Sequence, residues 1–563
     1  MEYRNSFIQR KGENRMESGK RAISKDTLFA LIIVIVFTLG SLFYLHRSFD
    51  LILCSDESSE LILGKLIVEE HRLIPNNWYY STELRVLNNP MIYALAFHIT
   101  DNWHAVRLLS FAILYLIISC AVFFYAKSIG CRSLFPVFLV PFLIPTSLEY
   151  YRFVLWGGYY IPYIVVSLLG FSLVFFCSSG EKTHAKRSLY AVPAFILALL
   201  SSCNGPRQIF GFYGPLFMAA VLFMLLCRIE KQQEKFAYAK RFLSISLVSL
   251  VGAGCGYLLN NTVLRTQYSY FKYNLSFYPI TREVFFRAFR VFRAFFAVYG
   301  YRMGGTDMAT PWANIIAWII FLMAVCAILY ALIHRRAISK EYLLLTLFFL
   351  SSGACLVLLY SFTSMSLTPR YMIMTAVFAF SLITLWIKEA HYFRERMKQT
   401  LNIGLTLLIL INAMTTVVYC DLNSHLTRNS EDRLRLAEVL KEKGYFYGYA
   451  SYWEANILTE ISNGEIEMQH WYVGIDELYG HQSPTDEQYI NGVPLNHAWE
   501  WLQYKTHTTE TPSGKVFILF TQGGYSYYDD KDLLSDDQII YESDVYRVYG
   551  FDSYQEMESC IRS

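Results

Sequence analysis

Long runs of apolar residues constrain this chain more than any other feature of its sequence. Residues 27–45 (TLFALIIVIVFTLGSLFYL) and 401–419 (LNIGLTLLILINAMTTVVY) are each long enough to cross about 30 Å of hydrocarbon as a helix. Inside lipid every backbone N–H and C=O needs a partner within the chain, so such runs must be helical. The composition agrees, because only 17% of the residues are charged, against about 25% in soluble proteins. The sequence therefore predicts a polytopic α-helical membrane protein.

The apolar runs predict about eleven transmembrane helices. We place them at residues 27–46, 108–126, 134–148, 159–178, 188–203, 208–227, 242–259, 313–333, 343–362, 371–387 and 400–419. The first run follows a basic segment, as the apolar region of a signal peptide does. It is too long for such a region and no small-residue cleavage site follows it, so we expect it to be retained in the membrane.

Lysine and arginine are unevenly distributed among the segments that connect these runs. The N-terminal tail (1–26) is basic, and so are four short connections: EKTHAKR, RIEKQQEKFAYAKR, HRRAISK and KEAHYFRERMK. Because Lys and Arg near the ends of spans stay in the cytoplasm, we expect the tail and these connections to be cytoplasmic. An odd number of crossings then makes residues 420–563 an extracytoplasmic domain.

Two segments on the predicted outer side of the membrane domain (27–419) are longer than a connection needs. They cover residues 47–107 and 260–312, and loops of this length are usually functional. In the second loop Arg287, Arg290 and Arg293 recur every three residues, and six phenylalanines lie among them: Phe285, Phe286, Phe289, Phe292, Phe295 and Phe296. This spacing predicts a helix in the membrane interface, with its rings toward lipid. We expect a similar interfacial helix at 60–70 (ELILGKLIVEE).

The C-terminal domain has the pattern of a small α/β unit. The segment 433–444 (RLRLAEVLKEKG) has helical apolar spacing and ends on a glycine. Strands are predicted in YFYGYASYW, KVFILF and IIYESDVYRVYGF, which are rich in aromatic and β-branched residues. Aromatic residues near 447–472 and 497–501 could line a glycan-binding surface, but we expect them to fill the core of the domain.

Several classes of protein are disfavoured by composition. The net charge is +3 and no basic tract resembles a nucleic-acid-binding arm, so we expect no nucleic-acid partner. The eleven cysteines are scattered, without C-x-x-C or metal-ligand spacing. The sequence therefore predicts neither a disulfide scaffold nor a zinc site.

Adjacent carboxylates directly after the first apolar run are the strongest candidates for chemistry. In SDESSELILGK (55–65) Asp56 and Glu57 are neighbours, and Glu60 follows about one helical turn later. Carboxylates in apolar surroundings are costly unless paired or used, and desolvation raises their pKa toward that of a general base. The alternative is a solvated helix start, where acids favour the N-terminal dipole.

An Asp-Glu pair that opens a long first external loop resembles the GT-C superfamily of membrane glycosyltransferases, which includes protein mannosyltransferases and aminoarabinose transferases. The segment TPRYMIMTAVFAFSL (368–382) is similar to the Arg-Tyr motif of a late span in bacterial members. The resemblance implies transfer of a sugar from a polyprenyl-phosphate donor to a glycan, lipid or protein acceptor outside the cytoplasm. It further implies that Asp56 is the base of an inverting displacement, and that Glu57 orients Asp56 or binds the acceptor.

A lipid-phosphate leaving group needs a cation, and arginine grips phosphate better than lysine does. Arg370, Arg207 and Arg152 stand at the outer ends of predicted spans and are our candidates for binding the donor phosphate. Glu60 and the row Arg287, Arg290 and Arg293 are weaker candidates for binding acceptor or membrane lipid. The scheme requires no cofactor, and it leaves a divalent metal open.

Two other functions are compatible with this layout. A flippase or transporter of lipid-linked saccharides would have inverted repeats and broken helices near the bilayer midplane, and we find no convincing repeat. A non-catalytic scaffold of a polysaccharide assembly complex would leave Asp56 replaceable. A polymerase of lipid-linked repeat units is a close variant of the transferase hypothesis.

Overall fold

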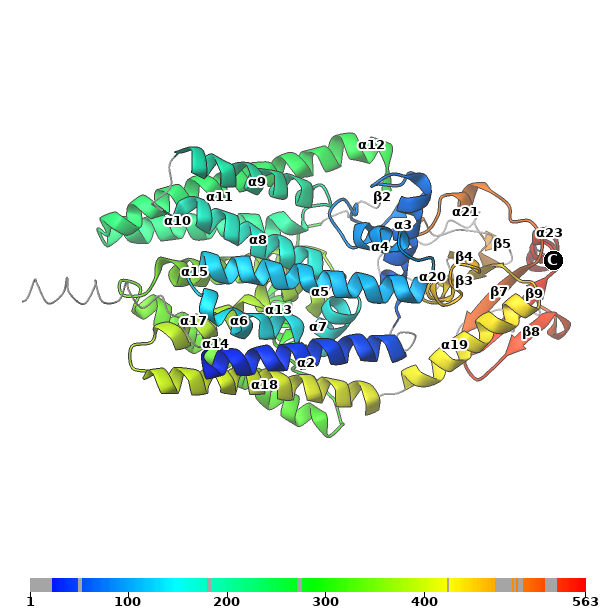
Figure 1. Cartoon of the computed structure of the whole chain (residues 1–563). Helices are drawn as coiled ribbons and strands as arrows, with labels where there is room; N and C mark the ends of the chain where they lie inside the picture. Colours follow the sequence, from blue (N-terminus) through cyan, green and yellow to red (C-terminus); the bar gives the residue numbers. More distant parts are fainter. Residues whose placement is uncertain are drawn as a thin grey trace, which may run out of the picture.

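Helices form an elongated bundle with a small sheet beyond one of its ends (Figure 1). The computed structural model describes residues 23–48, 53–179, 184–270, 276–422, 425–470, 489–490, 493–494, 500–521 and 534–562. Nine helices in these residues are long and apolar enough to cross a membrane, which makes the chain a multi-pass membrane protein. They include α2 (Lys25–Ser48), α5 (Trp103–Ser128), α8 (Ile161–Ser178), α10 (Gly214–Ile229), α11 (Gln233–Leu259), α14 (Ala309–Ile333), α15 (Lys340–Phe362), α17 (Phe378–Glu389) and α18 (Glu395–Leu422).

Two of the eleven predicted spans differ from straight crossings. α9 (His184–Ser202) is apolar only over Leu189–Ser202, which is shorter than the other spans. The predicted span 134–148 is a bent pair, in which α6 (Phe135–Leu143) meets the helix beginning at α7 (Leu148–Tyr150) at 93°. Pro145 lies in the break and Ile144 before it is extended (φ −118°, ψ 129°), as residues before proline prefer. A straight span is therefore wrong there, and the bent pair counts as a tenth crossing only if it is one span.

The C-terminal sheet has the strand order β4-β3-β7-β9-β8. β4 (Glu467–His470), β3 (Tyr447–Ala450) and β7 (Val516–Thr521) are parallel, whereas β9 (Tyr546–Phe551) and β8 (Ile539–Glu542) are antiparallel. Each of the three predicted strand segments contains a strand, but the last two residues of YFYGYASYW belong to a helix. The predicted helix is also present as α19 (His425–Glu442), and Gly444 behind it has φ +78°. α20 (Tyr452–Ile461) and α23 (Tyr554–Arg562) complete the described part of this domain, together with α21 (Thr506–Thr509), β5 (Tyr489–Ile490) and β6 (Val493–Pro494).

The aromatic side chains of this domain are divided between core and surface. Tyr449 is fully buried, whereas the side chain of Trp453 is exposed. The predicted aromatic residues at 471–472 and 497–499 lie outside the described residues.

Three of the basic connections predicted to be cytoplasmic meet at the end of the bundle away from the sheet (Figure 1). Lys235 Nζ donates hydrogen bonds to the carbonyl oxygens of Arg335, Arg336 and Ile338 at 3.0–3.2 Å. Nearby, the amide of Ser339 donates to Glu389 Oε2 at 2.8 Å. Three of the connections are thus held together side by side. The helix α3, which carries the predicted acids, lies at the other end of the bundle, beside the sheet (Figure 1).

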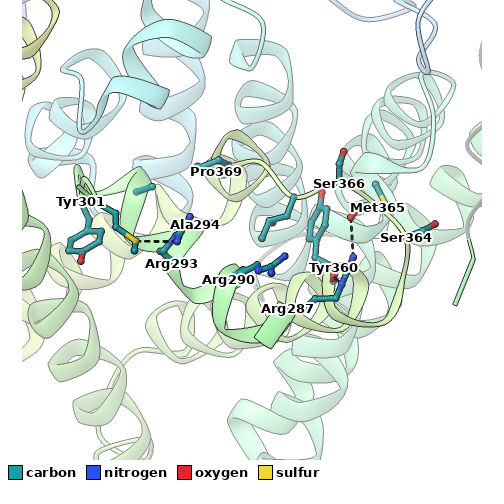
Figure 2. A pocket seen from close by; sticks show the side chains of 13 residues that line it. Arg287, Arg290, Arg293, Ala294, Tyr301, Tyr360, Ser364, Met365, Ser366 and Pro369 are labelled. Carbon is teal, nitrogen blue, oxygen red and sulfur yellow. Dashed lines mark hydrogen bonds between the residues drawn. The ribbon is translucent and has the colours of Figure 1, made fainter. Parts of the chain in front are cut away.

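Two helices were predicted to lie in the membrane interface, and only one has that character. α13 (Arg282–Val298) exposes four rings, those of Phe285, Phe286, Phe289 and Phe292, and its arginines face a pocket (Figure 2). The prediction for residues 60–70 is wrong. α3 (Ser55–Glu70) packs against α4 (Pro90–Phe97) and α20, and Leu61 to Leu63 are at most 2% exposed. Its apolar residues surround the helix, which is the pattern of a buried helix rather than an interfacial one.

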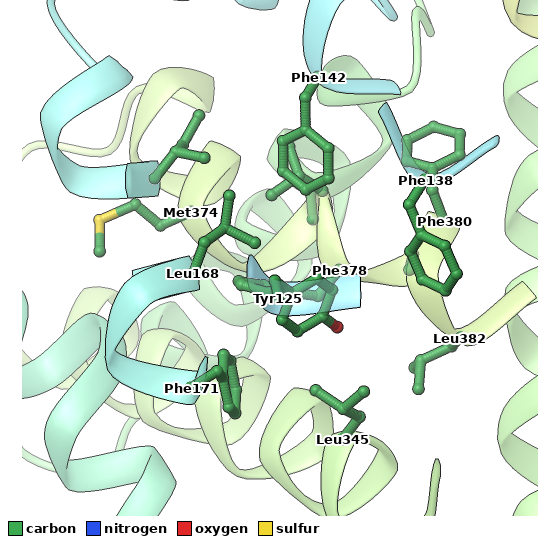
Figure 3. Close-up of a cluster of buried hydrophobic side chains, with 14 of the residues drawn as sticks. Tyr125, Phe138, Phe142, Leu168, Phe171, Leu345, Met374, Phe378, Phe380 and Leu382 are labelled. Carbon is green, nitrogen blue, oxygen red and sulfur yellow. The ribbon is translucent and has the colours of Figure 1, made fainter. Parts of the chain in front are cut away.

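The core of the bundle is aromatic and ties distant helices together (Figure 3). Tyr125 of α5, Phe171 of α8 and Phe378 of α17 pack with ring centroids 5.2–6.1 Å apart. On the far side of α8, α9 approaches α11 so closely that a Cβ at Gly256 would lie 2.1 Å from the carbonyl oxygen of Leu199. Small residues permit this approach between helices in lipid. These contacts form the rigid frame behind the candidate site.

Candidate active site

Asp56 lies in the first turn of α3 and is paired with Arg370. Arg370 Nη1 lies 3.4 Å from Asp56 Oδ2, although the two residues are 314 positions apart. The side chain of Asp56 is 18% exposed and that of Arg370 is 28% exposed, so neither is in open water. Asp56 Oδ1 accepts a hydrogen bond from the hydroxyl of Tyr452. Arg370 belongs to the short turn Pro369–Met372 (η6), which precedes α16 (Ile373–Ala376) and α17.

Arg207, the second predicted phosphate ligand, lies close to Arg370. Both guanidinium groups face the ring of Tyr371, at 5.2 Å for Arg207 and 5.6 Å for Arg370. Arg207 Nε lies 2.8 Å from Glu83 Oε1, and its Nη1 donates to the hydroxyl of Tyr160 at 3.0 Å. Its side chain is 24% exposed. Two arginines with partly open guanidinium groups thus share one aromatic ring.

A buried chain of charges leads from α3 to Arg207, and two of its members were missed by the sequence analysis. Glu60 Oε1 lies 3.3 Å from Arg85 Nε, and Arg85 Nη1 lies 3.4 Å from Glu83 Oε2. Asn89 donates to Glu60 Oε2 at 3.1 Å. Glu83 and Arg85 lie in the segment STELRVLNNP of the first long loop, where their spacing follows no recognisable motif. The only signal in the sequence that could have pointed to Glu83 and Arg85 is that both are charged and lie in the same loop as Asp56.

Two buried acids of α3, Glu57 and Glu60, have raised pKa values. Burial, and to a smaller extent the charge of Asp56, raise the pKa of Glu57 to about 7. Burial also raises the pKa of Glu60 to about 7, against the opposing effect of Arg85. The Cys54 thiol donates a hydrogen bond to Glu57. Gly157 leaves room for this carboxylate, because a Cβ at that position would lie 2.5 Å from Glu57 Cγ.

A second buried pair, Arg107 with Glu460, also escaped the sequence analysis. Arg107 Nε and Nη2 lie 2.5 Å and 2.6 Å from the two oxygens of Glu460, and both side chains are 1% exposed. Arg107 Nη2 also donates to the backbone carbonyl of Glu57 at 3.4 Å. An arginine at the start of an apolar helix needs a partner, which was the signal available in the sequence.

Arg152, the third predicted phosphate ligand, is not brought into this cluster. Its side chain is exposed on the bent pair, and it forms no ion pair or hydrogen bond with any residue that the structure describes. The cluster also offers no metal site, since no group of three His, Cys, Asp or Glu side chains in the described residues could hold an ion.

The arginine row of α13 lines a cavity of about 500 Å³ between this helix and residues 360–369 (Figure 2). Arg287 donates to the backbone carbonyls of Tyr360, Thr363 and Met365 at 2.6–3.4 Å. Arg290 lies between Arg287 and Arg293 and has no hydrogen bond or ion pair within the described part of the chain. Pro369, which immediately precedes Arg370 in the chain, also lines the cavity. The turn η6 therefore contributes one residue to the cavity and the next to the Asp56 cluster.

Comparison with solved structures identifies the architecture. The crystal structure of ArnT from Cupriavidus metallidurans bound to undecaprenyl phosphate has a TM-score of 0.52 and 11% sequence identity, and the match covers 92% of this chain and 97% of that chain. The apo structure of the same protein also has a TM-score of 0.52 and 11% identity, and that match covers 94% of this chain and 98% of that chain. No family model and no curated protein matches the sequence. The chain therefore shares the overall fold of these two structures, in agreement with the fold that the resemblance to GT-C glycosyltransferases implied.

Proposed function

We propose that the chain is an inverting glycosyltransferase that moves a sugar from a polyprenyl-phosphate donor to a glycan, lipid or protein acceptor on the outer face of the membrane. The observation that carries this proposal is the partly exposed pair of Asp56 and Arg370 at one end of a GT-C-like bundle. One of the similar ArnT structures contains undecaprenyl phosphate, which supports a donor of this lipid class.

In this mechanism the donor phosphate takes the place of Asp56 as the partner of Arg370. A phosphate oxygen competes well for a guanidinium group, and Arg207, which faces the same Tyr371 ring as Arg370, is our candidate for the second cation at this phosphate. The two cations then stabilise the negative charge that develops as the sugar–phosphate bond breaks. Asp56 is released from its ion pair at the moment when a base is needed.

The chemical step is a single displacement. Asp56 removes the proton from the acceptor hydroxyl, and the oxygen attacks the anomeric carbon from the face opposite the phosphate. A new carbon–oxygen bond forms as the bond to phosphate breaks with its electron pair, and the configuration inverts. The proton ends on Asp56, and the polyprenyl phosphate leaves in contact with Arg370 and Arg207.

The buried charges have supporting roles in this scheme. Glu57 accepts from a thiol and is only 5% exposed, so we assign it to holding the first turn of α3 rather than to binding acceptor. The chain from Glu60 through Arg85 to Glu83 fixes the orientation of Arg207. Arg152 is not needed. Arg290, with no partner in its cavity, is the α13 residue best placed to hold an anionic lipid or acceptor.

We further propose that the N-terminus is cytoplasmic and that the C-terminal domain is extracytoplasmic. The concentration of Lys and Arg in the connections at the end away from the sheet supports this orientation. The reaction would then take place at the outer leaflet, where Asp56 meets the C-terminal domain.

The test uses full-length protein in lipid nanodiscs with radiolabelled polyprenyl-phosphate sugars and a membrane extract as the source of acceptor. Asp56→Asn should lower transfer by roughly 10²- to 10⁴-fold, the usual contribution of a general base, with donor binding kept. The matched control is Asp101→Asn, which alters an exposed aspartate paired with Lys65 at 3.5 Å. Equal transfer by Asp56→Asn and wild type would refute the role of Asp56. Donor movement across vesicles without any transfer would favour the flippase.

A further inference from the structure

We infer that Tyr452 of the C-terminal domain is a positioning residue for Asp56, so that the active site is shared between the membrane helices and this domain. The inference rests on the proposed function, because it assigns a partner to the base of that reaction. Tyr452 is the first residue of α20, and 396 positions separate it from Asp56.

The two oxygens of the Asp56 carboxylate have different partners. Oδ1 accepts from the Tyr452 hydroxyl, while Oδ2 faces Arg370. When phosphate claims Arg370, the tyrosine still holds Oδ1, and Oδ2 is the oxygen left free for the acceptor proton. Burial raises the pKa of Tyr452 well above its ordinary value, and the negative charge of Asp56 raises it further. The hydroxyl therefore stays protonated and remains a donor.

Contacts of both its backbone and its ring hold Tyr452 in place. Its carbonyl accepts a hydrogen bond from the hydroxyl of Ser55, the residue before Asp56. One turn later in α20, Asn456 donates to the carbonyl of Ser55 at 3.4 Å. The Tyr452 ring packs edge-on against His470, with the centroids 5.2 Å apart. The first turn of α3 and the first turn of α20 are thus bonded directly to each other, which preorganises the hydroxyl.

The whole C-terminal domain is attached to the first long loop at further points. The Arg107–Glu460 pair anchors the end of α20 to α5. Beyond it, the backbone N–H of Trp103 donates to Asn463 Oδ1 at 2.8 Å. Tyr79 exchanges two backbone hydrogen bonds with the segment 502–503, at 2.7 and 2.8 Å. Because the domain is held at several separated points, Tyr452 stays in place beside Asp56.

The experiment compares Tyr452→Phe with Tyr447→Phe in the full-length protein under the transfer assay. Tyr447 is a tyrosine of the same domain whose hydroxyl donates to Gln469 at 3.2 Å, away from Asp56. Tyr452→Phe should lower kcat roughly 10- to 100-fold, as expected for the loss of a hydrogen bond to a charged group, with the KM for donor unchanged.

A double variant separates positioning from a general loss of structure. If Tyr452 acts through Asp56, Tyr452→Phe combined with Asp56→Asn should be no slower than Asp56→Asn alone. Wild-type kcat in Tyr452→Phe would overturn the inference while leaving the transferase intact. So would additive losses in the double variant, or an equal loss in Tyr447→Phe. Full activity in Asp56→Asn would overturn both proposals together.

Discussion

Replacing Glu57 by glutamine should stabilise the protein at alkaline pH and leave it unchanged at acidic pH. The pKa of Glu57 is about 7 in the folded state, against 4.5 for an unperturbed glutamate. Below pH 4.5 the carboxyl is protonated in both states, so it adds no penalty. As the pH rises through 4.5 to 7, the unfolded chain loses the proton first, and the folded state becomes less stable. A difference of about 2.5 in pKa corresponds to about 3 kcal/mol above pH 7.

Thermal unfolding in nanodiscs between pH 4 and pH 8 measures this effect. Glu57→Gln should melt with wild type at pH 4 and several degrees above it at pH 8, because glutamine keeps an acceptor for the Cys54 thiol without carrying charge. The control is Glu465→Gln, since Glu465 is half exposed and pairs with Lys441. A melting difference that is the same at both pH values would show that desolvation does not govern this carboxylate.

Two other perturbations test the contacts of the C-terminal domain and the α13 cavity. Glu460→Gln leaves a buried arginine poorly compensated and should cost roughly 3–5 kcal/mol in unfolding, whereas Lys441→Ala at an exposed pair should cost less than about 1 kcal/mol. Similar losses would contradict the assignment of the first pair as an anchor. Arg290→Ala should weaken binding of labelled polyprenyl phosphate about tenfold without lowering the melting temperature, and Arg287→Ala should lower the melting temperature, because only Arg287 holds backbone carbonyls. The reverse pattern would refute this division of roles.

Much of the fold was predictable, because it depends on local composition. Runs such as 27–45 must be helices in lipid whatever their neighbours are, and the strand at KVFILF has a local aromatic and β-branched pattern. The errors arose where packing decides. A proline was enough to break the span near residue 144, and α3 was assigned to the interface because a single segment does not reveal what covers it.

The candidate site was predictable in part for a similar reason. Asp56 and Arg370 each have a recognisable neighbourhood, so both could be named, and the fold pairs them. Tyr452 and Glu460 lie in no recognisable sequence pattern. One is a tyrosine among many and the other an acid on an ordinary helix, and their importance arises from contacts across more than 350 positions. Such partners are set by topology, which propensity and spacing do not encode.

The distance between Arg107 and Glu460 along the chain has a consequence for biosynthesis. The ribosome must add 353 residues after Arg107 before its partner exists, which takes roughly 20–70 s at about 5–20 residues per second. Throughout that interval the nascent chain carries an unneutralised guanidinium at the head of α5. A chain that stops before α20 never acquires this partner, and a buried guanidinium without one is costly. The neutralisation of Arg107 and the placement of Tyr452 thus depend on the same late-made helix.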